Sequence, residues 1–190
     1  MRLATLAAPF AASLLVTAAF AVLHVTLPLY GRDVLHDTTR RMGMLFAFMG
    51  VVSAIVQGGV VGRLAPRVGE GRLAAAGALL LAAGLALAPQ TSGTALLVAL
   101  GVLSAGSALA TPSIYAAVSR SATASQQGAA LGLTQTASTL GRIAGPTVAG
   151  FLIGARGINS PFWAGAALAM LGLVAALFLP RLQPAEPVRA

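Results

Sequence analysis

Cysteine and lysine are absent from the 190-residue sequence, and only four residues are acidic. Without cysteine the chain has no disulfide, no thiolate metal site and no cysteine nucleophile, so the redox compartment is not indicated. Charged residues make up 8% of the sequence and hydrophobic residues 57%, whereas ordinary globular proteins have about 25% charged residues. This composition excludes a water-soluble domain and predicts an integral membrane protein whose main partner is the lipid bilayer.

The net charge of +8 comes entirely from arginine. The arginines stand singly between apolar runs and form no basic face, so we expect no nucleic-acid partner. Their distribution instead indicates topology. Seven arginines are expected on the side of both termini (Arg2, Arg63, Arg67, Arg72, Arg120, Arg181, Arg189) and four on the other (Arg32, Arg40, Arg41, Arg156). The positive-inside rule therefore predicts a cell (inner) membrane protein with both termini in the cytoplasm.

Apolar segments follow one another along the chain, and about 20 residues at ~1.5 Å each cross a ~30 Å hydrocarbon core. We predict an all-α, polytopic membrane protein in which residues 1–180 form one domain. The six transmembrane helices are predicted at about 6–30, 42–62, 73–88, 94–116, 128–154 and 162–179, and residues 181–190 as a disordered cytoplasmic tail.

The ends of the first and fourth spans are similar. Leu27-Pro28-Leu29-Tyr30, where proline is expected to help end the helix, is echoed by Thr111-Pro112-Ser113-Ile114-Tyr115. This similarity predicts two inverted three-helix repeats. The N-terminus also resembles a signal peptide, but its apolar run exceeds the usual length of about 7 to 15 residues, so we expect an uncleaved span.

Polar side chains inside the spans are candidates for a substrate or proton pathway. Ser13, Thr17 and His24 share one face of the first span, where His24 is expected to be a buried ionisable group. It is either a proton relay or substrate contact, or a histidine bonded to a neighbouring helix. Gln57 either faces a polar cavity or ties two helices together. On the fourth span a cavity wall is predicted from Ser104, Ser107, Thr111 and Tyr115.

Arg142 lies near the middle of the fifth span. An arginine there costs at least ~2.5 kcal/mol on insertion scales, and all four acids fall in linkers or the tail. We therefore expect Arg142 to face water, carbonyls, or an acid on another chain or ligand, unless it snorkels to a headgroup. Gln135, Ser138 and Thr139 share its stripe, and Leu133, Leu140 and Phe151 lie opposite.

No catalytic or metal site is predicted. Residues 31–41 contain His36 and two aspartates, but arginines stand close to both and the spacing is not that of a metal site. An intramembrane serine protease needs a histidine on a late helix, whereas both histidines are early. We expect no enzyme and no cofactor.

The fifth span also carries a pattern of small residues, Gly132, Gly141, Gly145-Pro146 and Ala149-Gly150. Glycines let helices approach closely and Pro146 bends the helix, so packing alone is one interpretation. The spacing closely resembles the glycine-proline motif of the fifth helix in drug-proton antiporters of the major facilitator superfamily. A similar pattern recurs in their eleventh helix. Ala149 stands where that motif has glycine.

A second resemblance lies in the predicted loop 62–72. Gly62, Leu64, Ala65, Arg67, Gly69 and Arg72 match the superfamily signature between its second and third helices, or its degenerate copy between the eighth and ninth. Pro66 stands where the signature has an acidic residue, and Glu70 stands where it has a basic one. These departures favour the degenerate copy between the eighth and ninth helices, and they put in doubt the presence of a gating ion pair. Residues 118–127 resemble the tenth-to-eleventh linker, most closely in the tetracycline exporter branch.

The resemblance implies the second six-helix half of a proton-coupled exporter that moves small, hydrophobic molecules by alternating access. The proton gradient would supply the energy, and the partner would be a second six-helix half or a second copy of the chain. The alternatives are a non-transporting membrane scaffold or assembly subunit, or an inactive transporter fragment.

Overall fold

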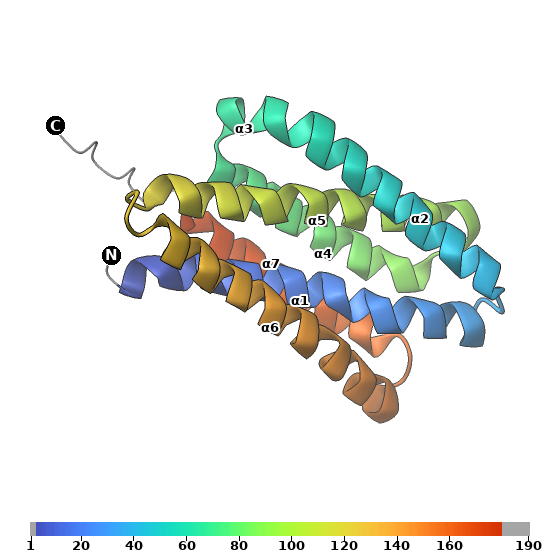
Figure 1. The fold of residues 1–190 in the computed structure, drawn as a ribbon. Helices are drawn as coiled ribbons and strands as arrows, with labels where there is room; N and C mark the ends of the chain where they lie inside the picture. Colours follow the sequence, from blue (N-terminus) through green and yellow to red (C-terminus); the bar gives the residue numbers. More distant parts are fainter. Residues whose placement is uncertain (1–2, 180–190) are drawn as a thin grey trace, which may run out of the picture.

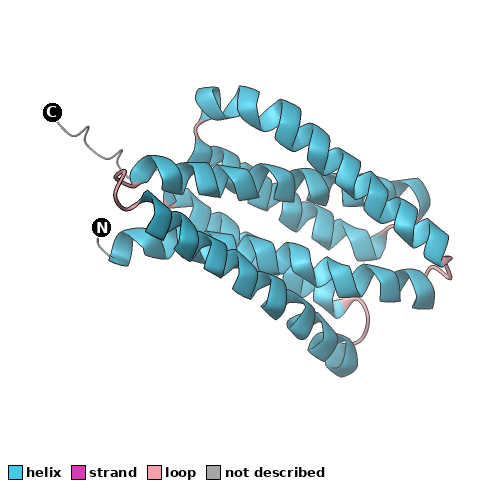
Figure 2. Ribbon diagram, in the orientation of Figure 1, coloured by secondary structure: helices cyan, strands magenta, loops and turns pink. Residues whose placement is uncertain are grey.

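The computed structural model describes residues 3–179, with side chains from residue 7 onward, and this part is helical with short connections and no strand (Figures 1 and 2). The elements in chain order are α1 (Leu3–Asp33), α2 (Thr39–Ile55), η1 (Val56–Val61), α3 (Gly62–Val68), α4 (Glu70–Leu87), η2 (Ala88–Gln90), α5 (Gly93–Ser121), α6 (Gln127–Arg156) and α7 (Ser160–Leu177). The predicted tail, residues 181–190, lies outside the described residues.

Among the described helices, five are long and apolar enough to cross a membrane, counting Thr39–Val68 as one. α6 corresponds to the fifth predicted span and has 30 residues, but it is not among the five. Its apolar sequence is interrupted by hydroxyl, amide and guanidinium groups. A helix with one polar face is suited to border a cavity. The interrupting residues are Thr134, Gln135, Thr136, Ser138, Thr139 and Arg142.

The helices pack as two inverted groups of three, α1 to α4 and α5 to α7. α1 packs against α6 and α7, just as α5 packs against α2 and α4, and α4 packs on α7. Exchanging the two groups therefore reproduces the same set of contacts. This is the arrangement expected of the all-α, inverted-repeat membrane fold predicted from the sequence.

The connections gather at two ends of the bundle (Figure 1). The start of α1, the α3–α4 and α5–α6 connections and the end of α7 lie at one end, and the other connections lie opposite. Four described arginines fall at each end, Arg63, Arg67, Arg72 and Arg120 against Arg32, Arg40, Arg41 and Arg156. The predicted charge bias therefore rests on Arg2, Arg181 and Arg189, which lie outside the described residues.

Glycines bring the helix backbones into contact. A Cβ on Gly77 would lie 2.5 Å from the Ala110 backbone nitrogen, which is why α4 and α5 pack so closely. On α6, a Cβ on Gly141 would lie 2.6 Å from the Leu14 carbonyl oxygen, and one on Gly145 would lie 2.5 Å from that of Ala18. Gly132 and Gly150 have open space at the same position. The glycine pattern of α6 therefore divides into two packing positions and two exposed ones.

The helices run beyond several ends expected from the sequence. α1 continues through Pro28 to Asp33, because a proline removes one hydrogen bond without preventing the following turns. The expected loop 62–72 is largely the helix α3, which continues from η1 and stops at Gly69. Gly69 has φ of 86°, a conformation that favours glycine. The expected linker 118–127 is shorter, since α5 reaches Ser121.

Candidate functional site

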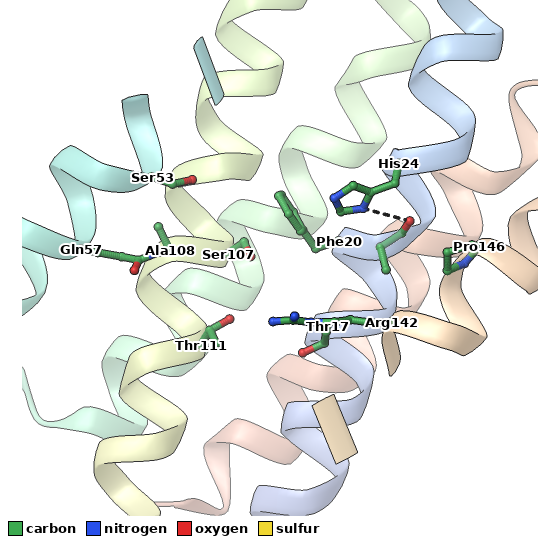
Figure 3. Close-up of a pocket in the computed structure, with 11 residues that line it drawn as sticks. Thr17, Phe20, His24, Ser53, Gln57, Ser107, Ala108, Thr111, Arg142 and Pro146 are labelled. Carbon is green, nitrogen blue, oxygen red and sulfur yellow. Dashed lines mark hydrogen bonds between the residues drawn. The ribbon is translucent and has the colours of Figure 1, made fainter. Parts of the chain in front are cut away.

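A cavity of about 540 Å³ lies between α1, the α2–η1 helix, α5 and α6 (Figure 3). Its size is typical of sites for small molecules. Its lining combines apolar groups with hydroxyl, amide and basic side chains from all four helices. The lining residues are Thr17, Phe20, Ala21, His24, Ser53, Gln57, Ser107, Ala108, Thr111, Arg142 and Pro146.

His24 faces this cavity from α1 and is exposed in the chain, rather than buried as the sequence suggested. The difference arises because the first span borders an open cavity. The ring centroids of His24 and Phe20 lie 5.5 Å apart in an edge-on arrangement, and that of Phe46 lies 6.3 Å away in a stacked one. The His24 Nδ1 atom lies 3.3 Å from the Ala21 carbonyl oxygen of the same helix (Figure 3). The imidazole is thus held between two aromatic rings at the cavity wall.

Arg142 enters the cavity from the middle of α6. Its side chain extends past α1 toward the α5 wall, where Thr111 lies (Figure 3). Among the described residues, Arg142 makes no ion pair and no side-chain hydrogen bond. The guanidinium therefore points across the bundle into the cavity, and not along α6 toward a headgroup.

Of the two possibilities left open for Gln57, the structure favours the cavity. Gln57 is exposed and lines the cavity next to Ser53, one turn earlier on the same helix. Ser107 and Thr111 line the adjoining wall on α5, the helix against which α2 and η1 pack, and they stand four residues apart. These four side chains supply hydrogen-bonding groups on the side of the cavity that faces Arg142 (Figure 3).

Two predicted pathway residues lie elsewhere. Ser104 is fully buried in the bundle, has no hydrogen-bond partner among the described residues and does not line the cavity. It stands only three residues before Ser107, which offsets the two side chains by about 60° around the helix axis, and this offset places Ser104 at the edge of the stripe, where it packs in the bundle. Gln135 is bound by Tyr115, whose hydroxyl donates to Oε1 at 2.6 Å. Both Gln135 and Tyr115 belong to a helix contact.

That contact continues into α1. The Ser138 hydroxyl lies 3.0 Å from the Tyr115 hydroxyl and 2.6 Å from that of Ser13. Ser13 also donates to the Thr134 carbonyl oxygen at 3.2 Å. The polar face predicted on the first span is therefore divided, since Ser13 joins helices while Thr17 and His24 face the cavity.

On three helices a proline follows about one turn after a residue that lines the cavity. Pro28, Pro112 and Pro146 lie inside α1, α5 and α6. Each lacks the N–H that would bond the carbonyl four residues earlier, and those carbonyls belong to His24, Ala108 and Arg142. All three residues line the cavity. A proline four residues after an ionisable residue inside a span, as after His24 and Arg142, is thus a signal that could have located this site.

The described acids are paired with arginine at the ends of the bundle. Arg32 binds Asp33 at 2.6 Å and Arg41 binds Asp37 at 2.9 Å. Arg120, in the last turn of α5, binds Glu70, the first residue of α4, at 3.0 Å. No group of acids and histidines within the described residues could hold a metal ion. None of the described residues that line the cavity is acidic.

Comparison with known proteins identifies a family and similar solved structures. The sequence model described as Major Facilitator Superfamily matches residues 9–190. The crystal structure of the human organic anion transporter MFSD10 (TETRAN) superposes with a TM-score of 0.84 at 24% sequence identity. The match covers 92% of this chain and 41% of MFSD10, so the chain spans less than half of that protein's length. No curated protein matches the sequence.

Proposed function

The chain belongs to the major facilitator superfamily, and we propose that it forms the second six-helix half of a proton-coupled exporter of the drug-proton antiporter branch. Members of this family are membrane transport proteins. The observation that carries the proposal is the cavity at mid-depth, lined by polar groups from four helices. In folds of this kind, the substrate site lies near the bilayer midplane between two halves that rock about it. The exported compound in this proposal is small, and most of its surface is hydrophobic.

A second six-helix half completes the cavity in this proposal. The continuous helix Thr39–Val68 and α6 both line the cavity and carry exposed apolar side chains near their middles, with Ile55 63% and Ile143 63% exposed. The two halves of the superfamily fold are related by an axis along the membrane normal. If the partner is a second copy, this axis places α2 of one copy against α6 of the other.

The absence of cysteine makes this arrangement testable by crosslinking. Copies carrying Ile55→Cys and Ile143→Cys should form disulfide dimers in native membranes. The matched control pairs Ile55→Cys with Leu171→Cys, because Leu171 is 57% exposed but lies on α7. Equal crosslinking of both pairs, or monomers only, would count against a second copy and leave a different six-helix half as the partner.

Proton coupling is assigned to His24 and Arg142. An imidazole ring can both accept and donate a proton, and His24 supplies the imidazole that lines the cavity. Arg142 supplies a fixed positive charge across the same space. We further propose that the chain lies in the cell (inner) membrane with both termini in the cytoplasm.

The experiment is efflux of a fluorescent hydrophobic compound from cells that lack their own exporters, with and without a proton uncoupler. Uncoupler-sensitive efflux is expected from cells expressing the chain, and loss of coupling in the His24→Gln variant. A Trp163→Phe variant is the control, because Trp163 lies outside the cavity. Efflux that continues unchanged in the uncoupler contradicts proton coupling. If neither the chain alone nor its coexpression with a first six-helix half gives efflux, transport by this chain is contradicted.

A further inference from the structure

Arg142 is a cation near the middle of a membrane helix without a counter-charge among the described residues. It lies close to the midpoint of the 30-residue α6, where insertion of an arginine costs at least ~2.5 kcal/mol. The described acids are held by other arginines at the bundle ends, at 2.6 to 3.0 Å. The charge is therefore placed in the cavity at an energetic cost that a structural role does not explain.

The groups around Arg142 determine the sign of charge that the cavity attracts. The ionisable side chains that line it are Arg142 and His24, and both are basic. The hydroxyls of Ser107 and Thr111 lie on the wall toward which the guanidinium points (Figure 3). A cavity that is lined by charges of one sign and has low-dielectric walls concentrates ligands of the opposite charge. This cavity attracts anions.

The remaining lining restricts the shape of the ligand. Phe20, Ala108 and Pro146 form apolar patches beside the polar groups, and the cavity volume of about 540 Å³ admits one small molecule. A ligand that satisfies both features has an acidic group at one end and an apolar body. Inorganic anions would leave the apolar patches exposed to water, which is unfavourable.

We propose that this site binds a small amphiphilic organic anion, such as an aromatic carboxylate, with its acidic group on Arg142 and its apolar body against Phe20. The proposal rests on the transport function above and names the substrate class of the same cavity. The planar guanidinium donates two parallel hydrogen bonds to a carboxylate, which is the strongest pairing available to either group. The bound anion supplies the counter-charge that the described residues of this chain do not.

Direct binding tests the proposal on the chain in lipid nanodiscs. Fluorescein is an aromatic anion, and rhodamine 123 is a cation with a similar ring system. We expect fluorescein to bind and rhodamine 123 to bind at least ~10-fold more weakly, as one charge-assisted hydrogen-bonded pair is worth about 1.5 kcal/mol or more. Benzoate should displace fluorescein, whereas the uncharged isostere benzamide should not. These measurements need no variant.

Variants then locate the charge. Arg142→Gln should weaken fluorescein binding by about tenfold or more, while Arg142→Lys, which keeps the charge but loses the planar fork, should retain part of it. Arg156→Gln is the matched control, since Arg156 lies on the same helix but outside the cavity, and should bind like the original chain. Thermal melting of each variant verifies folding.

The outcomes separate this inference from the proposed function. Equal displacement by benzoate and benzamide, preference for rhodamine 123, or unchanged fluorescein binding in Arg142→Gln would each overturn the anion site. Unchanged fluorescein binding in Arg142→Gln is the result expected if an acid on the partner half neutralises Arg142. Uncoupler-sensitive efflux of a cationic or neutral compound would overturn the anion site while leaving transport in place. If anion binding is retained but no efflux is observed, the proposed transport function is overturned and the anion site stands.

Discussion

The Tyr115 hydroxyl on α5 donates a hydrogen bond of 2.6 Å to Gln135 Oε1 on α6. The same hydroxyl lies 3.0 Å from the Ser138 hydroxyl, which in turn contacts Ser13 on α1 at 2.6 Å. α5 and α6 otherwise share few contacts, in contrast to α6 and α1. The tyrosine therefore ties the two helices that form opposite walls of the cavity.

Replacing Tyr115 with phenylalanine should loosen this connection. Hydrogen bonds between membrane helices contribute about 0.6 kcal/mol on average and up to ~1.7 kcal/mol, and two bonds are lost. We expect the free energy of unfolding in detergent micelles to fall by about 1 kcal/mol. A double-mutant cycle with Gln135→Ala should give a coupling of similar size. Thr139→Val is the control, because the Thr139 hydroxyl bonds only the Gln135 carbonyl of its own helix. Additive effects in the cycle would contradict the contact.

The glycines of α6 give a second prediction, with controls in the same helix. Gly141→Ala would place a Cβ 2.6 Å from the Leu14 carbonyl oxygen, and Gly145→Ala one 2.5 Å from that of Ala18. Both contacts are with backbone, which cannot rotate away, so each substitution should destabilise the chain by about 1–3 kcal/mol.

Gly132→Ala and Gly150→Ala should be neutral or stabilising by up to ~1 kcal/mol, because nothing lies within 4 Å of either position and alanine favours helix more than glycine does. Chemical unfolding in mixed micelles would compare all four variants. A uniform loss across the four would show that glycine is needed for another reason than close packing on α1.

The sequence predicted the helical membrane fold because its main signal is local. Apolar runs long enough to span a bilayer are visible without knowledge of any neighbour, and the repeated endings of α1 and α5 indicated the inverted repeats. Helix ends were less predictable. α1 passes through Pro28 and α3 fills most of the expected loop after Gly62, since a proline or glycine in a long helix is compatible with continuation when the next turns are favourable.

The cavity was only partly predictable for a different reason. Helical periodicity shows which residues share a face, but not which neighbour covers that face. Thr111 and Ser107 face the cavity, whereas Ser104 on nearly the same stripe is buried. The choice depends on how α5 is rotated against α4, and that rotation is set by Gly77 and Gly106, which meet the facing backbone. Such contacts between helices produce no periodic pattern of residues that could be recognised in the sequence.

Cysteine labelling distinguishes these positions. Since the sequence has no cysteine, each introduced thiol is the only one present. Ser107→Cys and Thr111→Cys should react with a membrane-impermeant maleimide, because both residues line the cavity. Ser104→Cys should remain unlabelled until the chain is denatured, because Ser104 is 0% exposed. Reaction is followed by a mass shift on a gel, with labelling after denaturation as the control for thiol content. Protection of all three positions would favour a closed, non-transporting scaffold.

The ion pair between Glu70 and Arg120 gives a last prediction, because it joins the start of α4 to the end of α5 within one half. The Arg120 side chain is 67% exposed and that of Glu70 14% exposed, with the charged atoms 3.0 Å apart. An exposed pair contributes about 0.2–1 kcal/mol. Glu70→Arg should therefore lower the free energy of unfolding by about that amount or somewhat more through repulsion, and Glu70→Arg combined with Arg120→Glu should recover most of it.

Salt should remove the difference between Glu70→Arg and the original chain, since the Debye length falls to about 3 Å at 1 M. Arg67→Glu serves as the control, because Arg67 lies at the same end of the bundle and takes part in no ion pair among the described residues. Because both partners belong to the same half, their separation does not change as two halves rock, and efflux should keep its uncoupler sensitivity in the reversed pair. If the charge-reversed double variant regains stability but shows no efflux, the ion pair has a role in gating instead.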